Sequence, residues 1–234
     1  IMAYLRRVLL ALAFACVTFF SAYSQENGTA APVADERPSH EVGSIFQLSL
    51  NKQIKRVGMH LQFHIFTLGA RVERFAPYAT VDYTVWQKHL KLVGTYYYMY
   101  HQPTTGNFYH RHRYQLGFVA SHQFAPIGIN WTSKFESTYT DGNPNNKWRN
   151  TLSFSYNIGN GCRWKPYVSA EVFLLLNGKN EGRVDRIWYE AGTSYTIDSK
   201  NSIDLKVREE QFITKPKGLA MTNTYIGFAY KFQL

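Results

Sequence analysis

The chain has 234 residues, a formal net charge of +10, 16% aromatic residues and a mean hydropathy of −0.32. This length suits one domain, and the low hydropathy excludes a helical membrane protein, which needs long apolar runs. A basic chain could bind nucleic acid, but no basic helical motif accompanies the charge, so we expect no nucleic-acid partner. A membrane β-barrel stays possible, because only alternate residues of its wall face lipid.

The first residues predict an exported protein. Arg6 and Arg7 form a basic region, an apolar stretch covers 8–20, and small residues at 22–24 offer a cleavage site. The apolar stretch is shorter than the ~20 residues that a membrane-spanning helix needs. We therefore expect a cleaved signal peptide over 1–24.

After a lead-in at 25–43 that has no periodicity, apolar and polar residues alternate with the period of a β-strand. In 202–210, Ile203, Leu205 and Val207 form an apolar face opposite a charged one. Eleven consecutive segments are candidate strands: 44–50, 56–65, 76–86, 89–100, 109–122, 127–139, 148–157, 167–174, 186–197, 202–210 and 221–233.

These segments predict an all-β domain over 44–234, an antiparallel up-and-down transmembrane β-barrel of about 10–12 strands. Its expected location is the outer membrane of a Gram-negative bacterium. Eleven strands conflict with the even number usual in bacterial barrels. If the last strand runs towards the periplasm, segment 44–50 runs in the same direction, and an antiparallel partner between them is missing.

The connections are expected to alternate in length, with the short side periplasmic. Tight turns are predicted at 87–89, 124–126, 159–161 and 198–201, and looser polar connections at 102–107, 140–147, 177–183 and around 215–218.

Alternation alone does not say which face points inward, because a soluble ligand-binding barrel has the same period. Aromatic residues near the segment ends favour the membrane barrel, since they suit interfacial girdles. The ending 227–232, a glycine followed by alternating aromatics, resembles the signal that the barrel-assembly machinery recognises in a last strand. The expected partners are therefore that machinery, outer-membrane lipids and lipopolysaccharide.

Several motifs also resemble an uncharacterised family of outer-membrane barrels, domain of unknown function 2490. They are Trp148-Arg149-Asn150-Thr151-Leu152, Pro166-Tyr167-Val168-Ser169-Ala170-Glu171, Lys200-Asn201-Ser202 and Tyr225-Ile226-Gly227-Phe228-Ala229-Tyr230. Members usually have a Trp soon after the signal peptide, where this chain has 43–45. The resemblance implies a fold and a location, and no activity.

If the apolar face meets lipid, the charged face lines the lumen. Its predicted members are Lys134, Glu136, Arg149, Glu171, Glu190, Asp204, Lys206 and Arg208. Charges of both signs at similar depth can pair and fill a narrow barrel. The expected function is therefore a structural or interaction barrel with a largely filled lumen, and a narrow solute channel is the first alternative.

A lipid or lipid A hydrolase is the second alternative, although an enzyme is not the expected function. Outer-membrane lipid hydrolases place a His and a Ser on the lipid-facing surface, so the candidates are His110, His112 and Ser137. His60 and His64 lie about 13 Å apart at strand rise and cannot share a metal ion. No metal site and no cofactor are expected.

Overall fold

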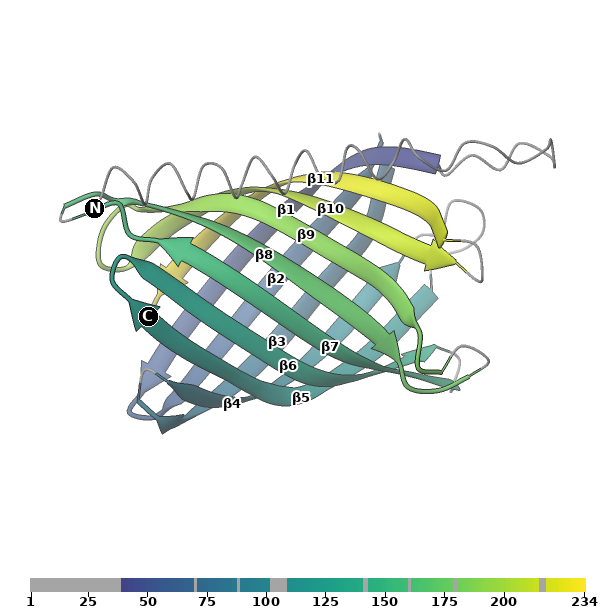
Figure 1. Cartoon of the computed structure of the whole chain (residues 1–234), viewed down its shortest axis with the longest axis horizontal. Coiled ribbons are helices and arrows are strands. Elements are labelled where there is room, and N and C mark those ends of the chain that lie inside the picture. The colour runs from purple at the N-terminus through teal and green to yellow at the C-terminus, as the bar shows by residue number, and fades with distance from the viewer. Residues whose placement is uncertain are drawn as a thin grey trace. The chain divides into compact units, whose positions relative to one another are not determined.

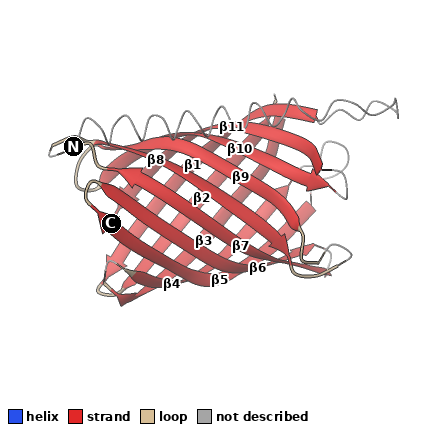
Figure 2. Cartoon of the chain, viewed as in Figure 1, coloured by secondary structure: helices blue, strands red, loops and turns tan. Residues whose placement is uncertain are grey.

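The computed structural model describes residues 39–69, 71–87, 89–101, 109–140, 143–159, 161–178, 181–214 and 218–234. In these ranges eleven strands form one closed barrel (Figure 1). All eleven predicted strand segments are confirmed, and the regular structure drawn in Figure 2 is strand. The expected signal peptide and residues 25–38 of the lead-in lie outside the described residues.

The strands extend beyond most of the predicted segments. They are β1 (Ser39–Ile54), β2 (Val57–Leu68), β3 (Arg71–Trp86), β4 (Leu90–His101), β5 (Tyr109–Phe124), β6 (Ile127–Thr140), β7 (Asn143–Tyr156), β8 (Trp164–Leu175), β9 (Val184–Thr196), β10 (Asn201–Thr214) and β11 (Gly218–Gln233). The wall begins at Ser39, so the barrel includes residues that the sequence analysis assigned to the lead-in.

The two faces of the wall have the chemistry that alternation predicts. On β2, Met59, Leu61 and Ile65 are exposed, whereas His64 lies inside, where it packs against Tyr78. Among the described residues, thirteen polar or charged side chains are buried against eight apolar ones. A water-soluble domain has the opposite arrangement, so the apolar face of this barrel points outward. The described residues include no helix long and apolar enough to cross a membrane, a finding that does not concern strands.

The barrel closes through a parallel seam. Neighbours along the chain pair antiparallel from β1 to β11, but β1 pairs parallel with β11, with Gly43 opposite Tyr225 and Asn51 opposite Gln233. The expectation of a purely antiparallel wall is wrong at this pair. Parallel pairing also answers the strand-count conflict, because an odd number of strands closes when the first and last run in the same direction. The segment at 44–50 therefore has two partners.

The seam defines two ends of the barrel. We call the end where β1 begins the N-terminal rim and the end where β11 finishes the C-terminal rim. The C-terminal rim carries the connections at 55–56, 87–89, 125–126, 157–163 and 197–200, and the N-terminal rim carries those at 69–70, 102–108, 141–142, 176–183 and 215–217.

The predicted alternation of connection lengths is weaker than expected. The loop predicted at 140–147 is mostly strand, because Asn143 to Lys147 continue the ladder with β6. The turn predicted at 159–161 belongs to the longer connection 157–163. The turn before β10 is tight as predicted. There the side chain of Asn201 and the backbone N–H groups of Lys200 and Asn201 donate to Asp198 and hold the pKa of its carboxyl below the ordinary value.

Candidate functional site: the barrel interior

A buried ion network joins the inner faces of β5, β6, β7 and β8. The Glu136 carboxylate accepts hydrogen bonds from Arg149 at 2.5 Å and from Gln115 at 2.7 Å, and Arg113 lies 3.4 Å away. Arg149 also donates to Glu171 at 2.8 Å. Only 1% of Glu136 is exposed. A buried carboxylate is tolerated when charged donors surround it. The strand register supplies two of the donors, because Gln115 lies directly opposite Glu136 and Arg149 lies opposite Lys134, the next inward position on β6.

A second network joins β8, β9, β10 and β11. Glu190 accepts two hydrogen bonds from Arg208, and Lys206 lies 3.4 Å from the same carboxylate. Asp204 accepts from Tyr167 at 2.8 Å and from Ser194 at 2.7 Å, with Lys231 at 3.4 Å. The list of predicted lumen charges thus splits into two clusters with different partners.

A third network lies nearer the N-terminal rim. Glu210 accepts hydrogen bonds from Arg186 at 2.9 Å and from the indole of Trp188 at 2.6 Å. Arg186 also donates to Asp185, which pairs with Lys147 at 2.5 Å. None of these five residues was among the predicted lumen charges.

Aromatic rings separate the charged groups. The guanidinium of Arg149 lies 4.4 Å from the Phe173 ring centre, and that of Arg208 lies 4.6 Å from the Trp188 ring centre. Tyr78 and Tyr97 stack with 4.3 Å between their ring centres. Such cation–π contacts stabilise a guanidinium that has lost its water, so the rings both fill space and stabilise the networks.

Several contacts link strands that are not neighbours in the wall. The hydroxyl of Tyr225 on β11 lies 3.2 Å from Glu73 on β3. Lys147 on β7 reaches Asp185 on β9, and Tyr167 on β8 reaches Asp204 on β10. Side chains therefore extend into the lumen and bridge strands that are not adjacent in the wall. Because the central charges are nearly inaccessible to water, this part of the interior is filled.

Lys134 differs from the other predicted lumen charges. It points inward on β6, yet in the described part of the chain its ammonium group has no hydrogen bond or ion pair. Its charge interacts through space with Arg149, Glu171 and Glu136. Both carboxylates are already bound by Arg149, so Lys134 is half-buried without a direct partner.

The three hydrolase candidates lie on the outer wall and do not form a catalytic set. Ser137 donates to Asn146 at 2.7 Å and is 7% exposed. His110 and His112 each bond a tyrosine of β4 through Nδ1, at 2.5 Å and 2.9 Å. The Ser137 hydroxyl is therefore committed to the strand on the other side of β6, and no contact in the described residues joins it to either imidazole.

The two histidines of β2 make hydrogen bonds inside the barrel. His60 bonds Asn51 at 2.8 Å and Asp82 at 2.7 Å, and His64 bonds the hydroxyl of Tyr78 at 3.0 Å. The two histidines therefore have different partners. Among the described residues no group of three or more metal-ligating side chains comes together.

Sequence reasoning missed some inward residues that alternation could have found. Arg111 and Arg113 alternate with the outward His110 and His112 on β5, so the same period assigns them to the lumen. Glu73 had no such signal, because a β-bulge beside Phe66 interrupts the period there. The partners across the lumen had none either, since they depend on how the barrel closes.

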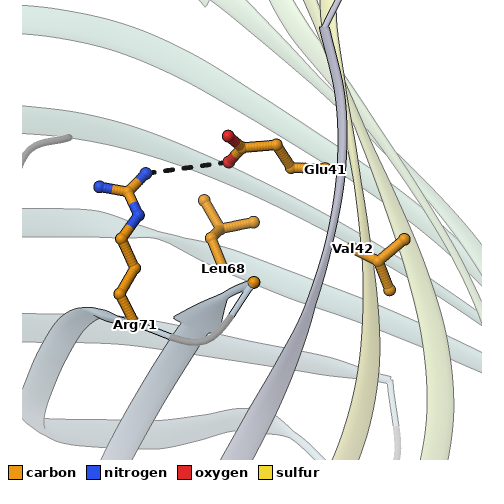
Figure 3. A pocket seen from close by; sticks show the side chains of 5 residues that line it. Glu41, Val42, Leu68 and Arg71 are labelled. Carbon is orange, nitrogen blue, oxygen red and sulfur yellow. Dashed lines mark ion pairs between the residues drawn. The ribbon is translucent and has the colours of Figure 1, made fainter.

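A hollow at the N-terminal rim is lined by Glu41, Val42, Leu68, Gly69 and Arg71, with a volume of about 490 Å³. Figure 3 shows Arg71 directed at Glu41 over Leu68, with Val42 on the other side of β1. The two charges lie 3.8 Å apart and are partly exposed. This surface ion pair contributes little by itself and suggests no chemistry.

The family model described as "Protein of unknown function (DUF2490)" matches residues 43–222. The match runs from β1 into β11. No curated protein matches the chain.

Proposed function

The chain belongs to the DUF2490 family, and we propose that it is an outer-membrane β-barrel with a structural or interaction role whose charged interior closes the lumen. The observation that carries this proposal is the inverted wall: apolar side chains outside and buried ion networks inside. Lipid is the solvent that makes an apolar exterior favourable. The outer wall would contact acyl chains and lipopolysaccharide, and β11 would be the strand that the barrel-assembly machinery recognises.

The spacing of ring clusters on the outer wall supports this proposal. Near the N-terminal rim, His112 lies beside Tyr96. Near the C-terminal rim, His122 stacks with His89 and contacts Phe124. Along β5 the two histidines are ten positions apart, about 33 Å at strand rise and about 25 Å in height at the usual tilt, which matches the apolar band of a membrane barrel.

The filled interior favours a closed barrel over a solute channel. In an open pore the lumen-facing charges would contact water, whereas Glu136, Gln115 and Glu210 are at most 2% exposed. Barrels with a wide aqueous channel have 16 or more strands, and this one has eleven. The hydrolase alternative has less support, because Ser137 bonds Asn146 instead of a histidine.

Heat modifiability with conductance tests the proposal. We expect residues 25–234, refolded in detergent, to give a β-rich circular dichroism spectrum and a gel band whose mobility changes on boiling in SDS. The same sample in planar bilayers should show no discrete conductance steps. A protein that stays soluble without detergent and shows no mobility change would contradict the membrane barrel. Regular conductance steps from a verified folded sample would contradict the closed lumen.

A further inference from the structure

One part of the inner wall carries polar side chains that make no hydrogen bond or ion pair with the described part of the protein. It consists of Lys134, Thr132 and Asn130 on β6, Thr151 and Ser153 on β7, and Ser169 on β8, and we call it the Lys134 wall. Thr132 pairs with Thr151, and Ser153 pairs with both Asn130 and Ser169, so the six residues form one continuous patch. All six are half-buried, neither fully enclosed nor exposed.

The side chains of the Lys134 wall have no hydrogen-bond partner or ion pair in the described part of the protein. The neighbouring interior differs, because Glu136, Arg149 and Glu171 bind one another. Polar groups inside a barrel require water or a ligand when the protein does not satisfy them. The patch therefore offers one ammonium group, four hydroxyls and one carboxamide to the lumen.

The position of Lys134 depends on the glycine opposite it. Gly117 pairs with Lys134 on the neighbouring strand, and a Cβ at Gly117 would lie 2.8 Å from Lys134 Cγ. The aliphatic stem thus lies against the glycine backbone. Arg149 binds both Glu136 and Glu171, and among the described residues neither carboxylate makes a direct ion pair with the Lys134 ammonium group.

Exposure indicates the side from which a solute reaches this patch. Towards the N-terminal rim the inner wall is closed, with Glu136 and Gln115 at most 2% exposed. Towards the C-terminal rim, Ser155 and Ser121 continue the inner faces of their strands and are only partly buried. Water can therefore reach the patch from the C-terminal rim, which faces the periplasm if the proposed function holds.

We propose that the Lys134 wall is a binding site for a small solute that carries an oxyanion, a phosphate or a carboxylate. A lysine ammonium attracts the negative charge, and Ser and Thr hydroxyls donate to its oxygens. The site goes beyond the proposed function, which requires only a closed barrel, and depends on it solely for the side of the membrane that it faces.

Equilibrium dialysis of the refolded full barrel tests the site. The probes are inorganic phosphate, acetate, glucose 6-phosphate and glucose, at one ionic strength. We expect saturable binding of at least one anionic probe and none of glucose. Lys134→Met keeps the stem over Gly117 and removes the charge, so it should weaken that binding at least tenfold. Lys200→Met makes the same charge change in an exposed turn at the same rim and should leave binding unchanged.

Ser153→Ala keeps the site testable if Lys134→Met does not fold. It removes one hydroxyl from a half-buried position and should weaken binding about threefold. Glucose bound as well as glucose 6-phosphate, equal anion binding by wild type and Lys134→Met, or no saturable anion binding by a verified folded barrel would each overturn the site. A barrel that is heat-modifiable but binds none of the anions removes this site alone, whereas a soluble protein without a mobility change removes the proposed function.

Discussion

Glu136 illustrates how charge is held inside this barrel. Two guanidinium groups and the amide of Gln115 surround its carboxylate. Lys134 lies on the same strand face, two positions away, and has no direct partner among the residues that the structure describes. Both residues are charged and point inward, but only Glu136 has direct charged partners. Comparing variants at the two positions therefore measures how much ion pairing contributes to stability.

Glu136→Gln should therefore destabilise the barrel far more than Lys134→Met. Removing one partner of a buried ion network leaves uncompensated charge and costs about 3–5 kcal/mol. Removing the unpaired ammonium group should change the free energy of unfolding by less than about 1 kcal/mol. Urea titrations of the folded protein in lipid vesicles, followed by tryptophan fluorescence, measure both. Equal losses for the two variants would contradict the network.

Two glycines on neighbouring strands differ in the room around them. A Cβ at Gly117 would lie 2.0 Å from the Ser133 carbonyl oxygen, whereas at Gly94 the nearest atom is Leu116 Cδ2 at 3.5 Å. Gly117→Ala should therefore cost about 1–3 kcal/mol through overpacking, with Gly94→Ala as the tolerated control. The same urea titration measures the free energy of unfolding of both variants. An unchanged value for Gly117→Ala would contradict the close approach of β5 to β6 at this position.

At the scale of elements, the parallel seam between β1 and β11 is the least usual feature. Its register places Ser44 opposite Ile226 and Phe46 opposite Phe228, all four outward. The seam joins strands from the two ends of the barrel sequence, so only long-range pairing can form it. The order and direction of the other pairs follow from simple hairpins.

A disulfide trap tests the seam. In a Cys162→Ser background, the pair Ser44→Cys with Ile226→Cys should oxidise to a cross-link, because directly opposite Cα atoms lie within disulfide range. The pair Ser44→Cys with Tyr230→Cys, shifted by four positions, is the matched control. Mobility on gels run without reductant measures the cross-link. Efficient cross-linking of the control pair alone would show a different register.

The strands could be located from the sequence, because the contrast between an apolar and a polar face is local and has a period of two. Their ends at the rims could not. Asn143 to Lys147 are mostly polar on both faces, so the period disappears although the ladder with β6 continues. That Arg149 would bind both Glu136 and Glu171 could not be predicted, since this depends on register across three strands. The odd number of strands is explained by the parallel pairing of β1 with β11, which are far apart in the sequence.

At the scale of the whole molecule, the proposed outer-membrane function requires the apolar outer face of the wall to meet lipid. Trp131 is 46% exposed on the outer wall of β6. Trp188 on β9 points inward, where its indole donates to Glu210 and lies against Arg208. The two residues have the same fluorophore on opposite faces of one barrel, and the chain has five tryptophans in total.

The most direct test is quenching by lipids with brominated acyl chains. Two proteins are compared in such vesicles, one that keeps only Trp131 and one that keeps only Trp188, with the other tryptophans replaced by Phe and folding verified by heat modifiability. We expect strong quenching of Trp131 and little of Trp188, because the bromine atoms reach only the outer wall. Equal quenching of both, or quenching of Trp188 alone, would contradict the assignment of the two faces.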